Sequence, residues 1–220
     1  MADFKTVSLA DQVFEKLEND IILGAYPRGE ILTELKLVEQ LGVSRTPIRE
    51  ALRRLEQERL IEDSGKGSVV LGITVEDLRD IMNIRQHVEG LASYYATKNQ
   101  TPEGLEKLRH IIELHDFYAE KKDIENMRKL DDEFHDTLSE MSRRNVIIDT
   151  LAPLHRKTRR YRKLSIQAEK RLIRCVQEHK AIYEAVAAGD AELAYKQTAQ
   201  HIINAKENLM GIMGRQENNG

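Results

Sequence analysis

Residues 41–52 read LGVSRTPIREAL, and this segment indicates the fold of the first part of the chain. A segment with helical spacing of apolar residues, Glu34–Leu41, stops at Gly42. Only Gly42 and Val43 separate it from Ser44, a suitable N-cap for a second helix that continues to about Arg59. Two helices joined by so tight a turn are typical of a helix-turn-helix.

The sequence on both sides of this motif extends the prediction. Ser8 precedes apolar residues at four-residue spacing, and Gly24 follows them, which predicts a helix between the two. Downstream, residues 60–64 and 68–71 flank Gly65-Lys66-Gly67, the pattern of a small β-hairpin. Residues 1–72 are therefore predicted to form a winged helix-turn-helix domain that binds DNA.

The second helix of the motif has a basic face. Its apolar residues (Ile48, Ala51, Leu52 and Leu55) point inward, so Arg45, Thr46, Arg49 and Arg53 face solvent. Residues 44–54 hold four arginines and one acid. An arginine can bridge O6 and N7 of guanine, and Ser44 or Thr46 can reach a phosphate. The arginine spacing alone is equally typical of a solvated basic face.

The composition of the whole chain points to a folded protein of the cytoplasm. The 220 residues carry a net charge of −3 and a single cysteine, Cys175. One cysteine excludes an internal disulfide and fits a reducing compartment. The N-terminus lacks the apolar stretch of a secretory signal, and no apolar run is long enough to span a bilayer. An isoelectric point near 6.2 argues against nucleic acid, but it averages over the local excess of arginine.

Residues 73–220 are predicted to form an all-α bundle of about six helices. Thr74-Val75-Glu76-Asp77 resembles a capping box that opens the first of them. The residues at helical spacing along it are Leu78, Ile81, Ile84, Arg85, Val88 and Leu91. The expected helices that follow cover 101–120, 123–142, 145–164, 169–188 and 190–213. The fold class is thus mainly α, a winged helix-turn-helix followed by a helical effector-binding and dimerisation domain.

Four residues of this second part are candidate metal ligands. Asp131 and His135 are one helical turn apart, a spacing that suits chelation, while His179 and His201 each lie mid-helix among apolar neighbours. Taken singly, the first pair is as typical of a charged helix surface, and each of the other histidines of a hydrogen-bonded core residue. Spacing by itself leaves these alternatives open.

The string VSRTPIREAL, with Gly24, Tyr26-Pro27-Arg28-Gly29 and Leu32 before it, resembles the DNA-binding region of GntR-family transcription regulators. The resemblance covers residues 9–71. It implies that Arg45, Thr46 and Arg49 contact operator DNA, that Ser44 lies near the backbone, and that the wing tip with Lys66 and Gly67 enters the minor groove. Leu35 stands where many members have arginine.

The second part resembles the FCD domain of the FadR subgroup. The resemblance lies in Asp131-x-x-Phe134-His135, Glu178-His179-x-x-Ile182 with Gly189-Asp190, and His201-Ile202. It implies that Asp131, His135, His179 and His201 bind a divalent metal, for which three imidazoles and a carboxylate suit Zn²⁺ and also admit Ni²⁺ or Mn²⁺. It further suggests Arg85 and Arg159 as contacts for an anionic effector. The other histidines (His87, His110, His115 and His155) are interpreted as ordinary surface or structural residues.

These observations predict a transcription regulator rather than an enzyme. We expect a homodimeric repressor that binds double-stranded operator DNA and responds to a small organic acid at the metal. Repression is the usual sign in the family. Two other classes stay open at this point: a metal-dependent hydrolase, and a structural DNA-binding protein that no metabolite controls.

Overall fold

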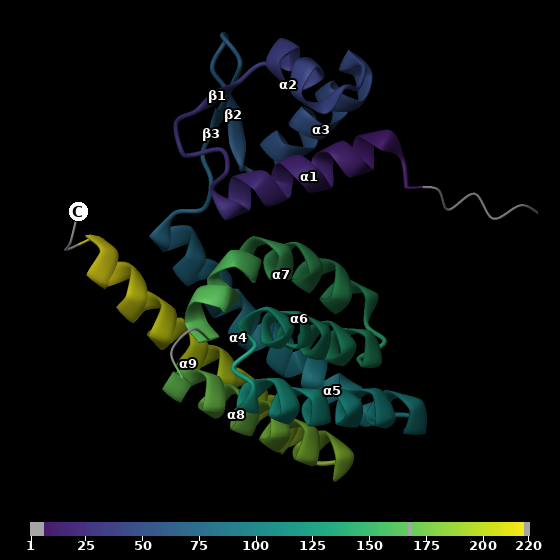
Figure 1. The fold of residues 1–220 in the computed structure, drawn as a ribbon. Coiled ribbons are helices and arrows are strands. Elements are labelled where there is room, and N and C mark those ends of the chain that lie inside the picture. The colour runs from purple at the N-terminus through teal and green to yellow at the C-terminus, as the bar shows by residue number, and fades with distance from the viewer. Residues whose placement is uncertain (1–6, 167–168, 218–220) are drawn as a thin grey trace, which may run out of the picture. The chain divides into compact units, whose positions relative to one another are not determined.

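The computed structural model describes residues 7–166 and 169–217, and the chain divides into two compact units at Thr74. The first unit is a three-helix domain with a small sheet, and the second is made of helices (Figure 1). None of the described helices combines the length and the apolar character that crossing a membrane requires.

The first unit contains α1 (Leu9–Leu23), α2 (Glu34–Leu41) and α3 (Arg45–Gln57). A capping box starts α1, because the Ser8 hydroxyl accepts from the Asp11 amide at 3.1 Å while the Asp11 carboxylate accepts from the Ser8 backbone. Gly24 ends the helix with φ +80°, and Gly42 ends α2 with φ +66°. The predicted helix-turn-helix is confirmed. Helix α3, the second helix of the motif, ends at Gln57, two residues before the expected Arg59.

A three-stranded antiparallel sheet completes this unit. The strands are β1 (Ile31–Leu32), β2 (Ile61–Asp63) and β3 (Ser68–Val70), in the order β1-β3-β2. Ile61 pairs with Val70 in the hairpin, and Ile31 pairs with Val69 on the outer side of β3. The hairpin was predicted, but β1 was not, because two residues are too few to show alternation of polar and apolar side chains.

The core of this unit draws on every helix. Leu17, Leu37, Ile48 and Leu55 are fully buried together with Leu32 of β1. Burying side chains of this kind stabilises the fold by roughly 1.5–3 kcal/mol each. The apolar face of α3 is therefore held against α1 and α2, and its opposite face is left to solvent.

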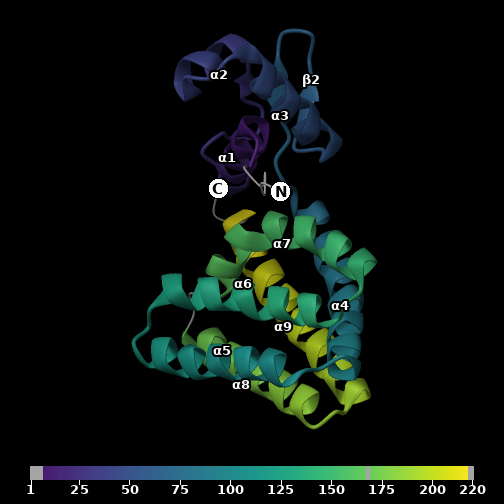
Figure 2. The ribbon, with the colours of Figure 1, turned by 90° about the vertical axis from the view of Figure 1, so that its right-hand side faces the viewer.

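The second unit consists of α4 (Val75–Lys98), α5 (Pro102–Glu120), α6 (Ile124–Met141), α7 (Asn145–Ile166), α8 (Glu169–Ala187) and α9 (Ala191–Glu217). The long helices α4 and α9 pack along one another, α5 packs against α6 and α8, and α6 packs against α7 (Figure 2). Phe134, Leu108, Ile111 and Ile182 form a buried apolar cluster in this bundle. The all-α prediction is confirmed.

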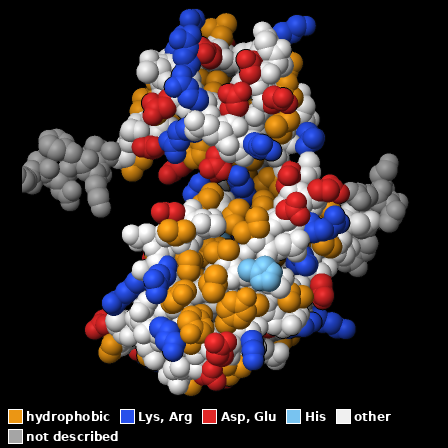
Figure 3. Space-filling view, turned by 180° about the vertical axis from the view of Figure 1, so that it is seen from behind, with side chains coloured by type: hydrophobic (Ala, Val, Ile, Leu, Met, Phe, Trp, Pro, Cys, Tyr) orange, Lys and Arg blue, Asp and Glu red, His pale blue; other side chains and the backbone are white. Residues whose placement is uncertain are grey.

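Helix α4 differs from its prediction in which face it buries. Ile84 and Leu91 were expected among its inward apolar residues, but they are 47% and 42% exposed. Arg85 and Glu89 are buried instead, at 3% and 2% exposure. The inward face of α4 is thus partly charged, because the bundle interior supplies partners for both groups. Hydrophobic side chains gather on one outer face of the helical unit (Figure 3).

The wing supplies a test of the sheet. Gly67 has φ +142°, and a Cβ added there would lie 2.7 Å from the Leu32 carbonyl oxygen. Gly65 has φ +73° but open space around it. Both Gly→Ala changes strain the backbone, while only Gly67→Ala pushes β1 away from β3. We expect Gly67→Ala to lower the free energy of unfolding by at least about 1 kcal/mol more than Gly65→Ala. Urea unfolding measures this, and equal losses would contradict the packing described.

Candidate metal centre and candidate nucleic-acid interface

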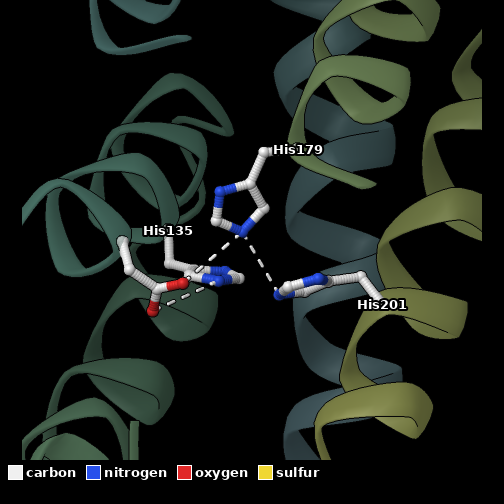
Figure 4. Close-up of side chains that lie close together, drawn as sticks. His135, His179 and His201 are labelled. Carbon is white, nitrogen blue, oxygen red and sulfur yellow. Dashed lines mark hydrogen bonds and ion pairs between the residues drawn. The ribbon is translucent and has the colours of Figure 1, made fainter. Parts of the chain in front are cut away.

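Four buried side chains converge in the helical unit. Asp131 and His135 come from α6, His179 from α8 and His201 from α9. Each offers one ligand atom, and the four atoms lie within 4.8 Å of one another. The three imidazole rings point toward a common centre (Figure 4). From their spacing in the sequence, these residues could be considered only separately. The structure brings them together in one cluster.

The atoms that face the centre are the Nε2 atoms of the histidines. His179 Nε2 lies 3.3 Å from His201 Nε2 and 3.6 Å from Asp131 Oδ1. His135 Nε2 lies 4.0 Å from Asp131 Oδ2. In the absence of an ion, two imidazole nitrogens this close gain only one hydrogen bond between them.

In two of the three histidines, the Nδ1 atom, on the far side of the ring from the centre, lies next to a carboxylate. His135 Nδ1 lies 2.5 Å from Glu89 Oε2 of α4, and His201 Nδ1 lies 2.7 Å from Glu178 Oε2 of α8. A carboxylate at Nδ1 keeps the proton there, so the lone pair of Nε2 faces the centre. This orients two of the three imidazoles as metal ligands before any ion binds.

The protonation states suit a cation as well. Burial lowers the pKa of His135 to about 4 and the pKa of His179 well below its ordinary value. Burial alone would raise the pKa of Asp131, but the Arg162 guanidinium and the neighbouring imidazoles hold it well below its usual range. Near neutral pH these groups are therefore two neutral imidazoles and one carboxylate, the forms that bind metal.

The donor set fits a divalent ion. Three imidazole nitrogens and one carboxylate oxygen suit Zn²⁺, and Ni²⁺ and Mn²⁺ accept the same donors. Such a set leaves room for a further, exchangeable ligand on an ion that takes five or six. The chemistry that a bound ion would supply is attraction of an anionic oxygen ligand.

Two histidines that were expected to be ordinary surface or structural residues belong to the surroundings of this cluster. His155 on α7 is buried between Asp136 Oδ1 at 2.7 Å and Glu89 Oε1 at 3.1 Å. His115 on α5 is fully buried, and its Nδ1 lies 3.5 Å from Nδ1 of His179. No local motif marks these residues, because their partners lie 19 to 66 positions away in the chain.

A small cavity of about 20 Å³ borders the cluster. Asp131, His135 and His201 line it together with Arg85 and Arg162. Of the two arginines suggested as effector contacts, Arg85 thus faces the cluster. Arg159 is nearly half exposed, pairs with Asp132 at 3.5 Å and lines a separate surface hollow. Arg162 follows Arg159 by three residues, which places it about 60° round α7, and it occupies the inward position that Arg159 lacks.

Cys175 also lines this cavity. Its thiol donates to Asp131 Oδ1 at 3.5 Å, and burial raises the pKa of the thiol well above its usual range.

The candidate nucleic-acid face lies on α3 and the wing. Arg45, Thr46, Arg49 and Arg53 are exposed, as is Lys66 at the tip of the hairpin. Ser44 is exposed and occupies the N-cap position of α3 without making a side-chain cap hydrogen bond. Arg49 Nε donates to Glu34 Oε1 at 2.7 Å, a contact that holds the guanidinium beside the N-terminal end of α2.

Family models match both units. The model described as "Bacterial regulatory proteins, gntR family" matches residues 9–70, and the model of the FCD domain matches residues 80–204. The two matches fall on the winged unit and on the helical unit that contains the histidine cluster.

Known proteins match over nearly the whole chain. The HTH-type transcriptional repressor RspR of Escherichia coli (strain K12) is 26% identical over 97% of this chain and 93% of its own length. The uncharacterized HTH-type transcriptional regulator YdhC of Bacillus subtilis (strain 168) is 28% identical over 92% of this chain and 91% of its own. Among solved structures, McbR/YncC of E. coli superposes with a TM-score of 0.76 at 25% identity, covering 96% of this chain and 100% of that one.

The buried histidine beside the cluster predicts a pH dependence. Burial lowers the pKa of His115 to about 4, whereas the unfolded chain titrates near 6.5. A histidine whose folded pKa is lowered contributes stability above pH 6.5, and this stability is lost as the pH falls toward 4. The loss amounts to about 3 kcal/mol for this group.

Urea unfolding of metal-free protein at pH 7 and pH 4 tests this prediction. We expect His115→Gln to lose about 3 kcal/mol less stability over that interval than the wild type. His110→Gln on the exposed face of the same helix is the control and should follow the wild type. The same pH dependence in both variants would show that His115 is not the group responsible.

Proposed function

This chain belongs to the gntR family of bacterial regulatory proteins, and on that basis we propose that it is a repressor whose affinity for operator DNA is set by a small carboxylate bound at a metal ion in its FCD domain. It is a transcription regulator rather than an enzyme, in keeping with its relatives. The observation that carries the metal-dependent part is the convergence of one carboxylate and three imidazoles within 4.8 Å.

The DNA contacts are proposed for α3 and the wing. The exposed guanidiniums of Arg45 and Arg49 would enter the major groove, with Arg53 further along the helix. Ser44 and Thr46 would contact phosphates, and Lys66 and Gly67 would follow the minor groove. The exposure of these side chains and the rigid support of α3 by α1 and α2 favour this assignment.

The metal contacts are proposed for Asp131, His135, His179 and His201, with Zn²⁺ the best match to the donors. Glu89 and Glu178 would hold two of the imidazoles in the required tautomer. A carboxylate effector would then reach the ion from the adjoining cavity, which Arg85 and Arg162 also line. RspR is a transcriptional repressor, as is the gluconate operon repressor of Bacillus licheniformis, and this likeness favours repression as the sign.

Control of DNA affinity requires that the effector bind two states of the protein unequally. The cavity of about 20 Å³ has room for roughly one water-sized group. A larger effector therefore has to move the side chains of α7, α8 or α9 that line it, which links occupancy to the packing of the bundle. A structural DNA-binding protein without an effector would show no such link.

A homodimer is the proposed assembly. One recognition helix reads one half-site, so a two-fold operator requires two copies of the chain. The half-exposed Ile84 and Leu91 on α4 give the helical unit apolar surface that a second copy would cover.

The DNA-binding assignment is tested by removing single guanidiniums. Arg45→Ala and Arg49→Ala should each weaken binding by about 1–3 kcal/mol, because each removes a contact to a base. Gel shifts with the DNA upstream of the protein's own gene measure this. Arg109→Ala, an exposed arginine on α5, is the control and should bind as the wild type does. Unchanged gel shifts in both α3 variants would refute the assignment.

The metal assignment is tested by elemental analysis. Purified protein should hold about one divalent ion per chain, and the double variant His179→Ala, His201→Ala should hold none, because it loses two of four ligands. His87→Ala, a histidine of α4 away from the cluster, should keep the ion. Wild-type protein that is repeatedly metal-free and binds neither Zn²⁺ nor Ni²⁺ would refute the proposal.

A further inference from the structure

Three arginines surround the cavity beside the histidine cluster. Arg85 comes from α4, Arg162 from α7 and Arg171 from α8, and they are only 3%, 6% and 7% exposed. A guanidinium is buried at high cost unless its charge and its five donors are matched. The donors of these arginines that lack a protein partner therefore indicate which kind of ligand the cavity could bind.

Arg85 is well matched. Its Nε donates to Glu89 Oε1 at 2.6 Å and its Nη1 to the Thr158 hydroxyl at 3.1 Å. Arg85 thus has protein partners in the described structure and is not the donor that a ligand would satisfy.

Arg162 is matched on one side only. Its Nη1 donates to Asp131 Oδ2 at 2.9 Å. Its Nε and Nη2 are buried and have no partner among the described residues. These two atoms form one edge of the guanidinium, the edge that binds both oxygens of a carboxylate in parallel. Arg162 therefore offers a buried carboxylate site next to the metal ligand Asp131.

Arg171 adds a donor to the same cavity. Its Nη1 donates to Glu178 Oε2 at 2.9 Å, while its Nε is buried and has no partner in the part of the chain that the structure describes. Arg162 and Arg171, each with buried donors that lack a protein partner, line one cavity with His135 and His201.

The charges lead to the same conclusion. The three buried guanidiniums are matched by three carboxylates, Glu89, Asp131 and Glu178. Asp132 lies 3.3 Å from Arg162, but it is itself paired with Arg128 at 2.7 Å. A divalent ion in the cluster would thus leave two positive charges uncompensated in a buried site. A ligand with one negative charge cancels only half of them.

We propose that the effector is a small dicarboxylate, with one carboxylate directed to the histidine cluster and the other on the Nε–Nη2 edge of Arg162, assisted by Arg171. This inference rests on the proposed metal-dependent function and adds the class of ligand. Because the cavity has room for roughly one water-sized group, a dicarboxylate has to displace some of the lining side chains. Arg162 Nη1 lies only 2.9 Å from the proposed metal ligand Asp131, which favours a short chain between the two carboxylates.

Isothermal titration of the full-length, Zn²⁺-loaded protein tests the proposal with matched acids. Succinate and glutarate are compared with butyrate and valerate, which have the same chain lengths but one carboxylate. We expect the dicarboxylates to bind at least about tenfold more tightly, because only they satisfy both sites. Inorganic phosphate, a compact dianion, is titrated in parallel.

Variants locate the second carboxylate. Arg162→Lys keeps a positive charge beside Asp131 but removes the two-donor edge, so succinate should bind no better than butyrate does. Arg171→Gln should reduce the preference for succinate without removing it. Arg159→Gln, on the exposed side of the same helix, should keep it in full. Metal content and thermal unfolding are measured for each variant to show that it is folded and loaded.

The outcomes separate this inference from the proposed function. Equal affinity for succinate and butyrate, or tighter binding of phosphate than of any dicarboxylate, would overturn the dicarboxylate and leave the metal-bound carboxylate standing. A wild-type preference for succinate that survives Arg162→Lys would overturn the role of Arg162. If no carboxylate binds the metal-loaded protein, both the inference and the effector proposal fail.

Discussion

The helical unit depends on the compensation of one buried carboxylate. Asp131 is 6% exposed, and an ionised carboxylate in such a place is tolerated only when cations and donors surround it. Arg162 from α7, Cys175 and His179 from α8 and His135 from its own helix provide that surrounding. Three helices are thus tied to a single side chain.

The same demand for compensation extends outward from the cluster. Glu89 faces His135, His155 and Arg85, and Glu178 faces His201, Arg171 and Asn204. Each carboxylate orients a histidine on one side and neutralises an arginine on the other. The ligands of the candidate metal centre are therefore held by groups on α4 and α8 that never touch the centre themselves. A change at the ion or its ligand would therefore alter the contacts between the helices that carry these groups.

The winged unit uses charge in the opposite way. Its apolar residues fill one continuous core, and Arg45, Arg49 and Arg53 of α3 are exposed, where their long side chains can reach a partner. The chain as a whole carries a net charge of −3, so the proposed attraction to DNA would be confined to this face. DNA binding of this kind would depend strongly on salt and on the single arginines of α3.

The features that could be predicted from the sequence are those that depend on neighbouring residues in the chain. Gly42 and Ser44 marked the tight turn of the helix-turn-helix, Ser8 and Gly24 the ends of α1, and the i, i+4 spacing the shared face of Asp131 and His135. The contacts of each buried group, in contrast, became known only from the folded structure. It brought His179 and His201 to Asp131, turned Arg162 rather than Arg159 toward the cavity, and gave His115 and His155 partners on other helices. It also placed Ile84 at the surface and paired β1 with β3. The physical reason is that helix ends and turns are set by neighbours in the chain, whereas the compensation of a buried charge depends on side chains that only packing brings together.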